Sequence, residues 1–311
     1  MQAISKSFGG VPALIEASLE ILPAEIMALV GQNGAGKSTM IKIINGAYVR
    51  DSGSISFDGT PWTAGSPQQA QRAGISTIFQ EINLIGYRSV AEIVFLGREP
   101  RRAFGVLDWA KMNAEAAALL ARFDVKVDVR EPLERFSTAI QQMVAIARAV
   151  SFKARLVIMD EPTSSLDEAE VAVLLRTIRQ LKSEGVAVIF VSHKLDELYQ
   201  VCDRVTIMRD GRTVAVSPMA AISKLQLVAA MLGRDLAEVE KKGATAFEGA
   251  AGTVGEELLA ARNIAIGHRV QNVSIDIRRG EMVGLATVAA GFPPGRLTVA
   301  VTFLTASVAH I

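Results

Sequence analysis

The sequence predicts an α/β protein in which a parallel sheet carries a phosphate-binding loop at the end of one buried strand. An apolar run from Ala28 ends in the pattern G-x-x-x-x-G-K-S, and a helix-compatible segment, 40–45, follows it directly. Two further apolar runs, 156–159 and 186–191, indicate strands that are buried on both faces of a sheet. Each of these two runs ends in polar residues, at the edge where parallel sheets bind ligands.

The residues of the loop suit a triphosphate for physical reasons. Side chains at Gly34 and Gly36 would hold the backbone away from phosphates, which main-chain N–H groups must wrap. The following helix adds the positive end of its dipole beneath them. Lys37 is suited to reach the β- and γ-phosphoryl oxygens, Ser38 to ligate Mg²⁺, and Thr39 to bond a more internal phosphate. The alternative is a Gly-rich turn before an ordinary helix. The predicted nucleotide-binding residues of the loop are Gly31, Gln32, Asn33, Gly34, Ala35, Gly36, Lys37, Ser38 and Thr39.

Composition bounds the class of protein. The chain has 311 residues, a formal net charge of +1 and 50% hydrophobic residues, which is enough for one large domain and a fragment of another. The balanced charge argues against a broad nucleic-acid-binding surface. A lone cysteine, Cys202, excludes an internal disulfide framework, suits a reducing compartment and is expected to be a buried structural thiol.

No targeting or membrane-spanning segment is expected. The N-terminus lacks the long apolar core of a secretory signal. The most apolar stretch, 282–309, is broken by glycines, prolines and an arginine into pieces too short to cross a bilayer. We therefore expect the chain to stay in the cytosol.

The first part of the chain indicates short strands separated by turns. Phe8 stands just before a Gly9-Gly10 turn, where its ring is placed either to stack on a nucleotide base or to join a small core. Asp58-Gly59 is typical of a hairpin turn. The expected strands are an N-terminal fragment, 13–21, 26–30, 54–57 and 74–79, with a turn at 51–53, and the last strand leads to Gln80.

From residue 90 to residue 150 the periodicity becomes helical, and its clearest helices are 112–123 and 140–150. This pattern indicates a helical insertion within an α/β chain. Beyond it, the sequence predicts helices at 168–183, 194–202 and 224–232, and a hairpin of strands 204–209 and 212–215.

Asp160 and Glu161 directly follow the strand that begins at Leu156. At the carboxyl end of a buried parallel strand, Asp160 can face the Mg²⁺ of a nucleotide, and Glu161 can hold or deprotonate an attacking water. Two acids after a strand can instead cap a helix, but the preceding phosphate loop favours the catalytic interpretation. His193 follows the next strand and is a candidate to contact the γ-phosphate, although a single histidine at a strand end is commonly structural.

Taken together, these pieces resemble the ATPase subunit of an ABC transporter over residues 1–233, and most closely the carbohydrate-import branch of the ribose, galactose and xylose type. The segments that carry the resemblance are Ile4-Ser5-Lys6-Ser7-Phe8-Gly9-Gly10-Val11, Ser89-Val90-Ala91-Glu92, Phe95-Leu96-Gly97-Arg98-Glu99, Gln141-Gln142-Met143-Val144, Asp160-Glu161-Pro162-Thr163-Ser164 and Ser192-His193-Lys194-Leu195-Asp196-Glu197.

The resemblance implies a P-loop NTPase fold, with a RecA-like core sheet, an antiparallel β subdomain and a helical ABC subdomain. It implies that Phe8 stacks on adenine and that Gln80 senses Mg²⁺ and links the nucleotide to the membrane subunit. It places Ser137 in the signature segment 136–141, which caps the ATP of an opposite domain, so hydrolysis needs two domains facing head to tail. Residues 165–167 would communicate between the two sites. Thr138 and Ala139 stand where two glycines are usual, and Phe136 stands where leucine is usual.

Members of this branch carry two such domains in one chain, and 273–286 parallels 17–30 as an internal repeat. A second phosphate loop should follow, yet 287–311 contains no acid, one arginine and no Lys-Ser pair. We interpret this stretch as the product of a reading-frame change or a truncated gene, against the alternative of a divergent tail. The expected organisation is a nucleotide-binding domain at 1–233, a linker at 234–256 and an incomplete second domain at 257–311.

The resulting expectation is an ATP-hydrolysing subunit, with ATP and Mg²⁺ as cofactors, that energises sugar import from the cytoplasmic face of the inner membrane. Glu161, His193 and Lys37 would be catalytic, and Ser38, Gln80 and Asp160 would serve the metal. The expected partners are ABC permease subunits, a second nucleotide-binding domain and, indirectly, a periplasmic sugar-binding protein, with no nucleic acid. The alternatives are a remnant that binds ATP without turnover and an ABC ATPase unrelated to transport.

Overall fold

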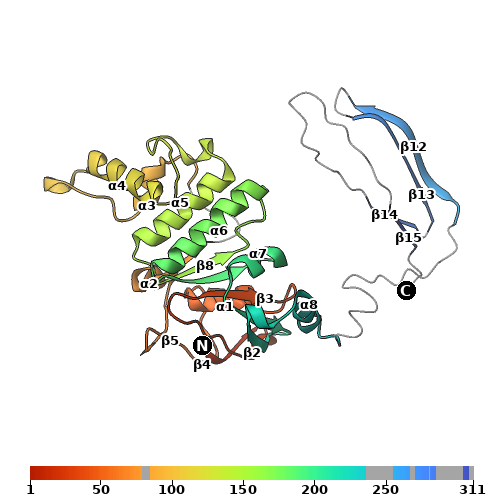
Figure 1. The fold of residues 1–311 in the computed structure, drawn as a ribbon, viewed down its shortest axis with the longest axis horizontal. Helices are drawn as coiled ribbons and strands as arrows, with labels where there is room; N and C mark the ends of the chain where they lie inside the picture. Colours follow the sequence, from red (N-terminus) through yellow and green to blue (C-terminus); the bar gives the residue numbers. More distant parts are fainter. Residues whose placement is uncertain (79–84, 236–254, 267–269, 280, 285–303, 308–311) are drawn as a thin grey trace. The chain divides into compact units, whose positions relative to one another are not determined.

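The computed structural model describes residues 1–78, 85–235, 255–266, 270–279, 281–284 and 304–307 (Figure 1). The chain divides into two compact units, Met1–Ala244 and Thr245–Ile311. The first unit contains the phosphate loop and every described candidate site residue, so it is the part that positions the site.

The first unit is organised around a mixed sheet of six strands in the order β11-β10-β3-β9-β8-β7. Neighbouring strands run parallel except at one edge, where β11 pairs antiparallel with β10. This confirms the α/β class. The strands are β3 (Ile26–Val30), β7 (Ile75–Ile78), β8 (Leu156–Asp160), β9 (Ala187–Val191), β10 (Arg204–Arg209) and β11 (Arg212–Pro218).

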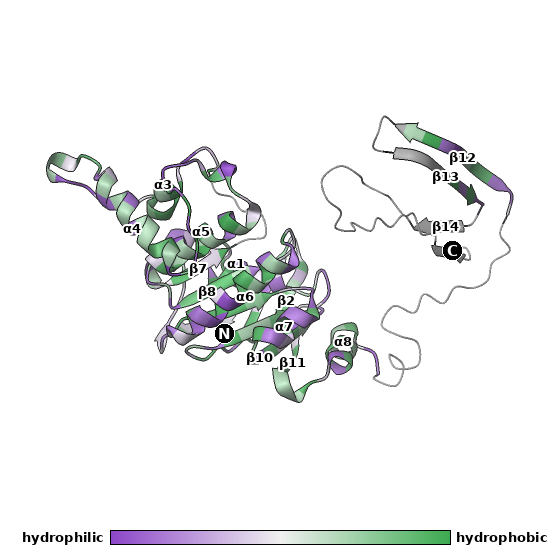
Figure 2. Ribbon diagram, turned by 45° about the horizontal axis from the view of Figure 1, so that its top comes forward, coloured by the Kyte–Doolittle hydropathy of each residue, from purple (hydrophilic) through white to green (hydrophobic). Residues whose placement is uncertain are grey.

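Each central strand packs against a separate hydrophobic core on either face of this sheet. In β3, Ala28 and Val30 belong to one core while Met27 and Leu29 belong to the other, because successive side chains of a strand point to opposite faces. All five residues of β3 are buried, as the continuous apolar run predicts. The strands of the sheet are accordingly mostly hydrophobic in Figure 2.

Helices cover both faces and supply the two cores. The helices of the first unit are α1 (Lys37–Ile44), α2 (Pro67–Ala73), α3 (Val90–Phe95), α4 (Trp109–Ala121), α5 (Thr138–Ser151), α6 (Glu168–Ser183), α7 (Leu195–Val201) and α8 (Lys224–Leu232), with short 3₁₀ turns η1 (Ala103–Gly105), η2 (Leu133–Arg135) and η3 (Met219–Ala221).

Several helices begin one to three residues away from the predicted start, among them α5 at Thr138 rather than 140 and α7 at Leu195 rather than 194, and one helix was not predicted. Helix α4 begins at Trp109 rather than 112, because the Asp108 side chain accepts a hydrogen bond from the Lys111 N–H and caps the helix. Helix α2 was not predicted. Its signals are local: Ser66 caps its N-terminus, Pro67 occupies the first turn, and Gly74 adopts the left-handed conformation at its end.

A second sheet is antiparallel, in the order β2-β1-β4, and its Ile4 and Leu14 belong to the same core as Met27 and Leu29 of β3. It consists of β1 (Gln2–Phe8), β2 (Val11–Ala17) and β4 (Ser52–Ser54), and β5 (Ser56–Phe57) and β6 (Thr60–Pro61) form a separate hairpin across the predicted Asp58-Gly59 turn.

The predicted turn at 51–53 is wrong, and the predicted strand 13–21 begins and ends earlier, at 11 and 17. Ser52 pairs with Ser5, and Ser54 pairs with Gln2, so the segment becomes a strand through partners far away in the sequence. Position 53 needs glycine for this pairing. A Cβ there would lie 2.4 Å from the Ala3 carbonyl oxygen, so any other residue would clash with β1.

The second unit contains two antiparallel strand pairs. Strand β12 (Glu257–Ile266) pairs with β13 (Val270–Arg278), and β14 (Glu281–Gly284) pairs with β15 (Leu304–Ser307). In the predicted repeat, β14 aligns with the start of β3, yet β3 lies between two parallel strands while β14 pairs antiparallel with β15. Most of the stretch where a second phosphate loop is expected, 285–303, lies outside the described residues.

Among the residues that the structure describes, no helix has the length and apolar composition needed to span a membrane.

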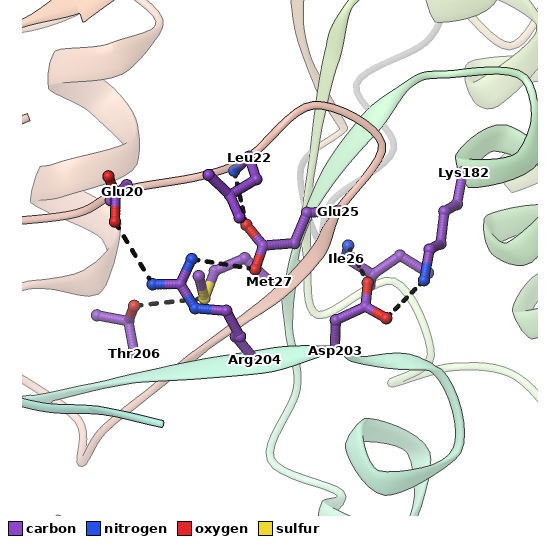
Figure 3. A network of polar contacts seen from close by, with 9 residues as sticks. All are labelled: Glu20, Leu22, Glu25, Ile26, Met27, Lys182, Asp203, Arg204 and Thr206. Atoms are coloured by element: carbon purple, nitrogen blue, oxygen red, sulfur yellow. Dashed lines mark hydrogen bonds and ion pairs between the residues drawn. The ribbon is translucent and has the colours of Figure 1, made fainter. Parts of the chain in front are cut away.

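A polar network secures the amino ends of β3 and β10, opposite the phosphate loop (Figure 3). The buried Glu25 carboxylate accepts hydrogen bonds from the Leu22 N–H at 2.6 Å and from the Arg204 guanidinium at 3.3 Å. Asp203 accepts one from the Ile26 N–H at 2.8 Å and one from Lys182 at 2.5 Å. The network therefore ties β3, β10 and α6 together through charge-assisted hydrogen bonds.

Removing one partner of this network should cost more than removing an exposed ion pair. Arg204→Ala leaves the buried Glu25 carboxylate with only the Leu22 N–H, and we expect the free energy of unfolding to fall by about 2–4 kcal/mol. Lys224→Ala breaks the exposed pair with Asp196 and should cost less than about 1 kcal/mol. Urea unfolding followed by tryptophan fluorescence measures both, and equal losses would contradict this account.

Candidate functional site

The phosphate loop joins the end of β3 to the start of α1, and two of its glycines are required by close packing. A Cβ at Gly31 would lie 2.3 Å from the Met208 carbonyl oxygen on β10. Gly36, the N-cap of α1, has φ of 101°, and a Cβ there would lie 2.6 Å from Leu14 Cδ2. Gly34 has φ of 82° but open space around it, so its backbone conformation alone favours glycine.

Lys37 is folded back into the loop. Its Nζ donates to the carbonyl oxygens of Gly31 at 2.7 Å and Gln32 at 3.0 Å. Burial lowers the pKa of Lys37 from its ordinary value, although the carboxylates of Glu161 and Asp160 act in the opposite direction. The loop thus holds a desolvated cation on neutral carbonyls, which is a favourable place for an anion to bind.

A cavity of about 400 Å³ opens over the loop, which is within the usual range for small-molecule sites. It brings the loop together with the carboxyl end of β8, as the sequence predicts. The residues that line it are Phe8, Ala13, Asn33, Gly34, Ala35, Gly36, Lys37, Ser38, Thr39, Asp160 and Glu161. The predicted site residues Gly31, Gln32, Ser137 and His193 do not line it, and Gln80 lies outside the described residues.

Asp160 and Glu161 occupy different environments although they are adjacent. Burial raises the pKa of Asp160, and the Glu161 charge raises it further, while Lys37 and His193 act in the opposite direction. Glu161 adopts a left-handed backbone with φ of 50°, and its N–H donates to the Val191 carbonyl oxygen at 3.0 Å. This turn directs the chain away from the sheet at the point where the cavity begins.

His193, although outside the cavity lining, meets Glu161 directly. The distance from His193 Nε2 to Glu161 Oε1 is 2.5 Å, and their side chains are 47% and 23% exposed. The two residues come from the ends of neighbouring parallel strands, β9 and β8, so the sheet order itself brings them together.

The residues present fit a magnesium ion that arrives with a nucleotide. Among the described residues, no group of three or more His, Cys, Asp and Glu side chains could hold a metal by itself. Ser38 and Asp160 do share the cavity, and Mg²⁺ commonly uses one or two protein ligands together with phosphate oxygens and water. The partly buried Asp160 carboxylate is a donor whose charge such an ion would compensate.

Phe8 is not part of a small core. It is 42% exposed, lines the cavity and packs edge-on against Tyr48, with ring centroids 5.1 Å apart. Lys6 Nζ lies 5.5 Å from the centroid of the Phe8 ring. Of the two interpretations left open by the sequence, this exposure favours an aromatic face available to a ligand.

Ser137 lies at the N-terminus of α5, where its side chain accepts from the Ile140 N–H and caps the helix. It belongs to the helical insertion and not to the cavity. Within one chain, therefore, the structure does not bring Ser137 and the phosphate loop together around one cavity.

A buried polar group that the sequence did not predict lies beside the loops that carry Glu161 and His193. Glu197 on α7 is 5% exposed, and its carboxylate accepts hydrogen bonds from Thr163 and Ser192. The sequence offered one signal for its burial. Glu197 lies one helical turn before Val201, which places it on the apolar side of the predicted helix 194–202.

Residues 14–164 match the model of a family described as ABC transporter. The chain is 45% identical, over 287 residues and 92% of its length, to a putative ribose/galactose/methyl galactoside import ATP-binding protein 2 of Burkholderia cenocepacia. It is 44% identical, also over 92% of its length, to the ribose import ATP-binding protein RbsA 2 of Streptomyces avermitilis. It spans 55% of the length of each of these relatives.

Solved structures support the fold. A nucleotide-free ATP-binding cassette from an ABC transporter matches with a TM-score of 0.63 and 22% identity, over 70% of this chain and 89% of that chain. A cassette in its ADP conformation matches with a TM-score of 0.64 and 20% identity, over 77% of this chain and 96% of that chain. Since fold and sequence agree, the chain belongs to the ABC transporter family of ATP-binding proteins.

Proposed function

We propose that this chain is the subunit that binds and hydrolyses ATP to energise sugar import through an ABC transporter. The observation that carries the proposal is the single cavity shared by Lys37, Ser38, Asp160 and Glu161, with His193 against Glu161. The names of the two relatives, which concern ribose and galactose import, support the sugar class. Because the chain spans 55% of those relatives, the activity of the whole protein is part of the proposal.

Phosphate binding would follow from the geometry of the loop. Residues 33–39 line the cavity at the start of α1, whose dipole favours negative charge there. Lys37 would exchange its two carbonyl acceptors for β- and γ-phosphoryl oxygens. These oxygens carry negative charge and the carbonyls do not, so they would pair with the buried ammonium more strongly. Phe8 would stack on the base from the rim of the cavity.

Hydrolysis would be the work of Glu161 and His193. Glu161 Oε2 or Oε1 accepts the proton of a water as its oxygen attacks the γ-phosphorus, and the bond to the β–γ bridging oxygen breaks to leave ADP. His193 contacts Glu161 at 2.5 Å, and we propose that it would donate to the γ-phosphoryl oxygens once a nucleotide is bound. A bound Mg²⁺ would neutralise charge on the phosphate oxygens; Ser38 and Asp160 would hold it, and by family resemblance Gln80 would join them.

Partners and domain organisation are part of the same proposal. Ser137 would cap an ATP bound by a second nucleotide-binding domain, which is supported by its position on α5, away from the cavity of its own chain. We propose domain bounds of 1–233 and 257–311, joined by a linker at 234–256. ABC permease subunits, and indirectly a periplasmic sugar-binding protein, would complete the assembly at the cytoplasmic face of the plasma membrane.

Glu161→Gln should separate ATP binding from turnover. The amide keeps the size of the side chain but cannot accept a proton from water, so we expect turnover to fall by about 10² or more while ATP binding persists. Glu168→Gln, an exposed change in the first turn of α6, is the matched control. Phosphate release is measured with and without candidate permease subunits.

Unchanged hydrolysis in purified Glu161→Gln protein would remove Glu161 from the role of base. Wild-type chain that binds ATP yet releases no phosphate under either condition would instead support a remnant that binds without turnover.

Asp160→Asn should stabilise the nucleotide-free protein while weakening Mg-ATP binding. Because the pKa of Asp160 is raised in the folded chain, its ionised form destabilises the fold above that pKa. We therefore expect the Tm to rise at pH 8, with a gain that shrinks as the pH falls through the pKa of Asp160. The dissociation constant of Mg-ATP should increase at least about tenfold.

The matched control for this change is Asp124→Asn, at an exposed position of the helical insertion whose φ of 58° asparagine tolerates. Thermal melting between pH 4 and pH 8 should show no comparable pH-dependent gain for it. An Asp160→Asn protein with a lowered Tm at pH 8 would show that the ionised carboxylate is favourable in the empty site.

A further inference from the structure

A buried carboxylate connects the two loops that carry the Glu161–His193 pair. Glu197 Oε2 accepts a hydrogen bond from Thr163 Oγ1 at 2.7 Å and another from Ser192 Oγ at 2.9 Å. Thr163 lies two residues after Glu161, and Ser192 lies directly before His193. One oxygen atom of α7 therefore links the loop that follows β8 to the loop that follows β9.

Lys194 closes this connection into a ring. Its Nζ lies 3.4 Å from Glu197 Oε1 and donates to the Thr163 carbonyl oxygen at 3.2 Å. Its N–H donates to Ser192 Oγ at 3.0 Å. The Glu197 charge is thus both paired and hydrogen-bonded, which is the condition under which a buried carboxylate is tolerated.

The loop after β8 is held from the helical insertion as well. Gln142 on α5, itself buried, donates from Nε2 to the Pro162 carbonyl oxygen at 3.2 Å. Pro162 stands between Glu161 and Thr163, so hydrogen bonds on both sides of the loop restrict the backbone that orients Glu161. Charge-assisted bonds to Glu197 are the stronger of these restraints.

We propose that Glu197 is a positioning residue: through Thr163 and Ser192 it fixes the separation and orientation of Glu161 and His193. This inference rests on the proposed function, because the pair matters only if Glu161 acts on water. Glu197 does not line the cavity and does not touch the nucleotide site. Its effect is expected in the geometry of the pair, where a displacement of about 1 Å can cost on the order of 10²-fold in rate.

The test uses the full chain and a change that keeps side-chain shape. Thr163→Val removes the hydroxyl that Glu197 accepts from, and Thr163→Ser restores a hydroxyl. Thr177→Val is the matched control, because Thr177 is an equally buried threonine whose hydroxyl donates within α6 to the Val173 carbonyl oxygen. Glu197→Ala tests the carboxylate itself.

The first readout needs no hydrolysis. The chain has three histidines, so the ¹⁵N resonances of the His193 imidazole can be assigned by comparison with His193→Gln. Glu161→Gln shows where the His193 resonances lie when the carboxylate of the Glu161–His193 pair is absent. We expect Thr163→Val and Glu197→Ala to move the His193 signals toward that position, and Thr163→Ser and Thr177→Val to leave them in place.

The second readout is steady-state hydrolysis of Mg-ATP. We expect Thr163→Val to lower kcat by about 10- to 100-fold while the KM for ATP changes by less than about threefold. In a Glu161→Gln background the same change should have no further effect, because the residue through which it acts is already disabled. A purely structural role would instead lower kcat by the same factor in both backgrounds.

A folded Thr163→Val protein with wild-type His193 resonances and wild-type kcat would overturn the inference. Failure of the proposed function looks different: Glu161→Gln itself would then retain wild-type hydrolysis, whatever the Thr163 variants do.

Discussion

The structure depends on how closely the phosphate loop approaches strand β10. At Gly31 the backbone passes so near the Met208 carbonyl oxygen that no side chain fits, and at Gly36 a side chain would meet Leu14 Cδ2 of the antiparallel sheet at 2.6 Å. The Gly211 N–H, in the turn between β10 and β11, donates to the Ala35 carbonyl oxygen at 3.2 Å. The loop is therefore held by three elements at once, through contacts that lie entirely within the chain.

This fixed shape determines where charge gathers. Lys37 is held inside the loop, the partly buried Asp160 lines the same cavity, and Glu161 and His193 meet at the ends of adjacent strands. Burial works against the charged forms of both Lys37 and Asp160, and a bound anion together with a cation would compensate both charges. Behind these groups, Glu197 supplies a rigid support from α7. The site thus combines charges that burial disfavours, on Lys37 and Asp160, with a buried charge that is fully hydrogen-bonded, on Glu197.

Local signals predicted the elements whose stability is local. Helix 168–183 was predicted with the observed bounds because its capping box and 3.6-residue pattern lie within its own sequence. Continuous apolar runs identified β3, β8 and β9. Strand β4 was missed because its partner is β1, some fifty residues away, and no local pattern marks it. Glu197 was missed for the same reason: its hydrogen-bond partners come from two distant loops.

The most direct test of the account is a calorimetric titration of Mg-ATP into the intact chain, with Lys37→Ala as the comparison. If a pre-shaped loop and its buried lysine form the binding site, the wild-type chain binds one nucleotide with a dissociation constant below about 1 mM, and the variant loses this binding while its circular dichroism is unchanged. A folded wild-type chain that takes up no Mg-ATP at millimolar concentration would contradict the account.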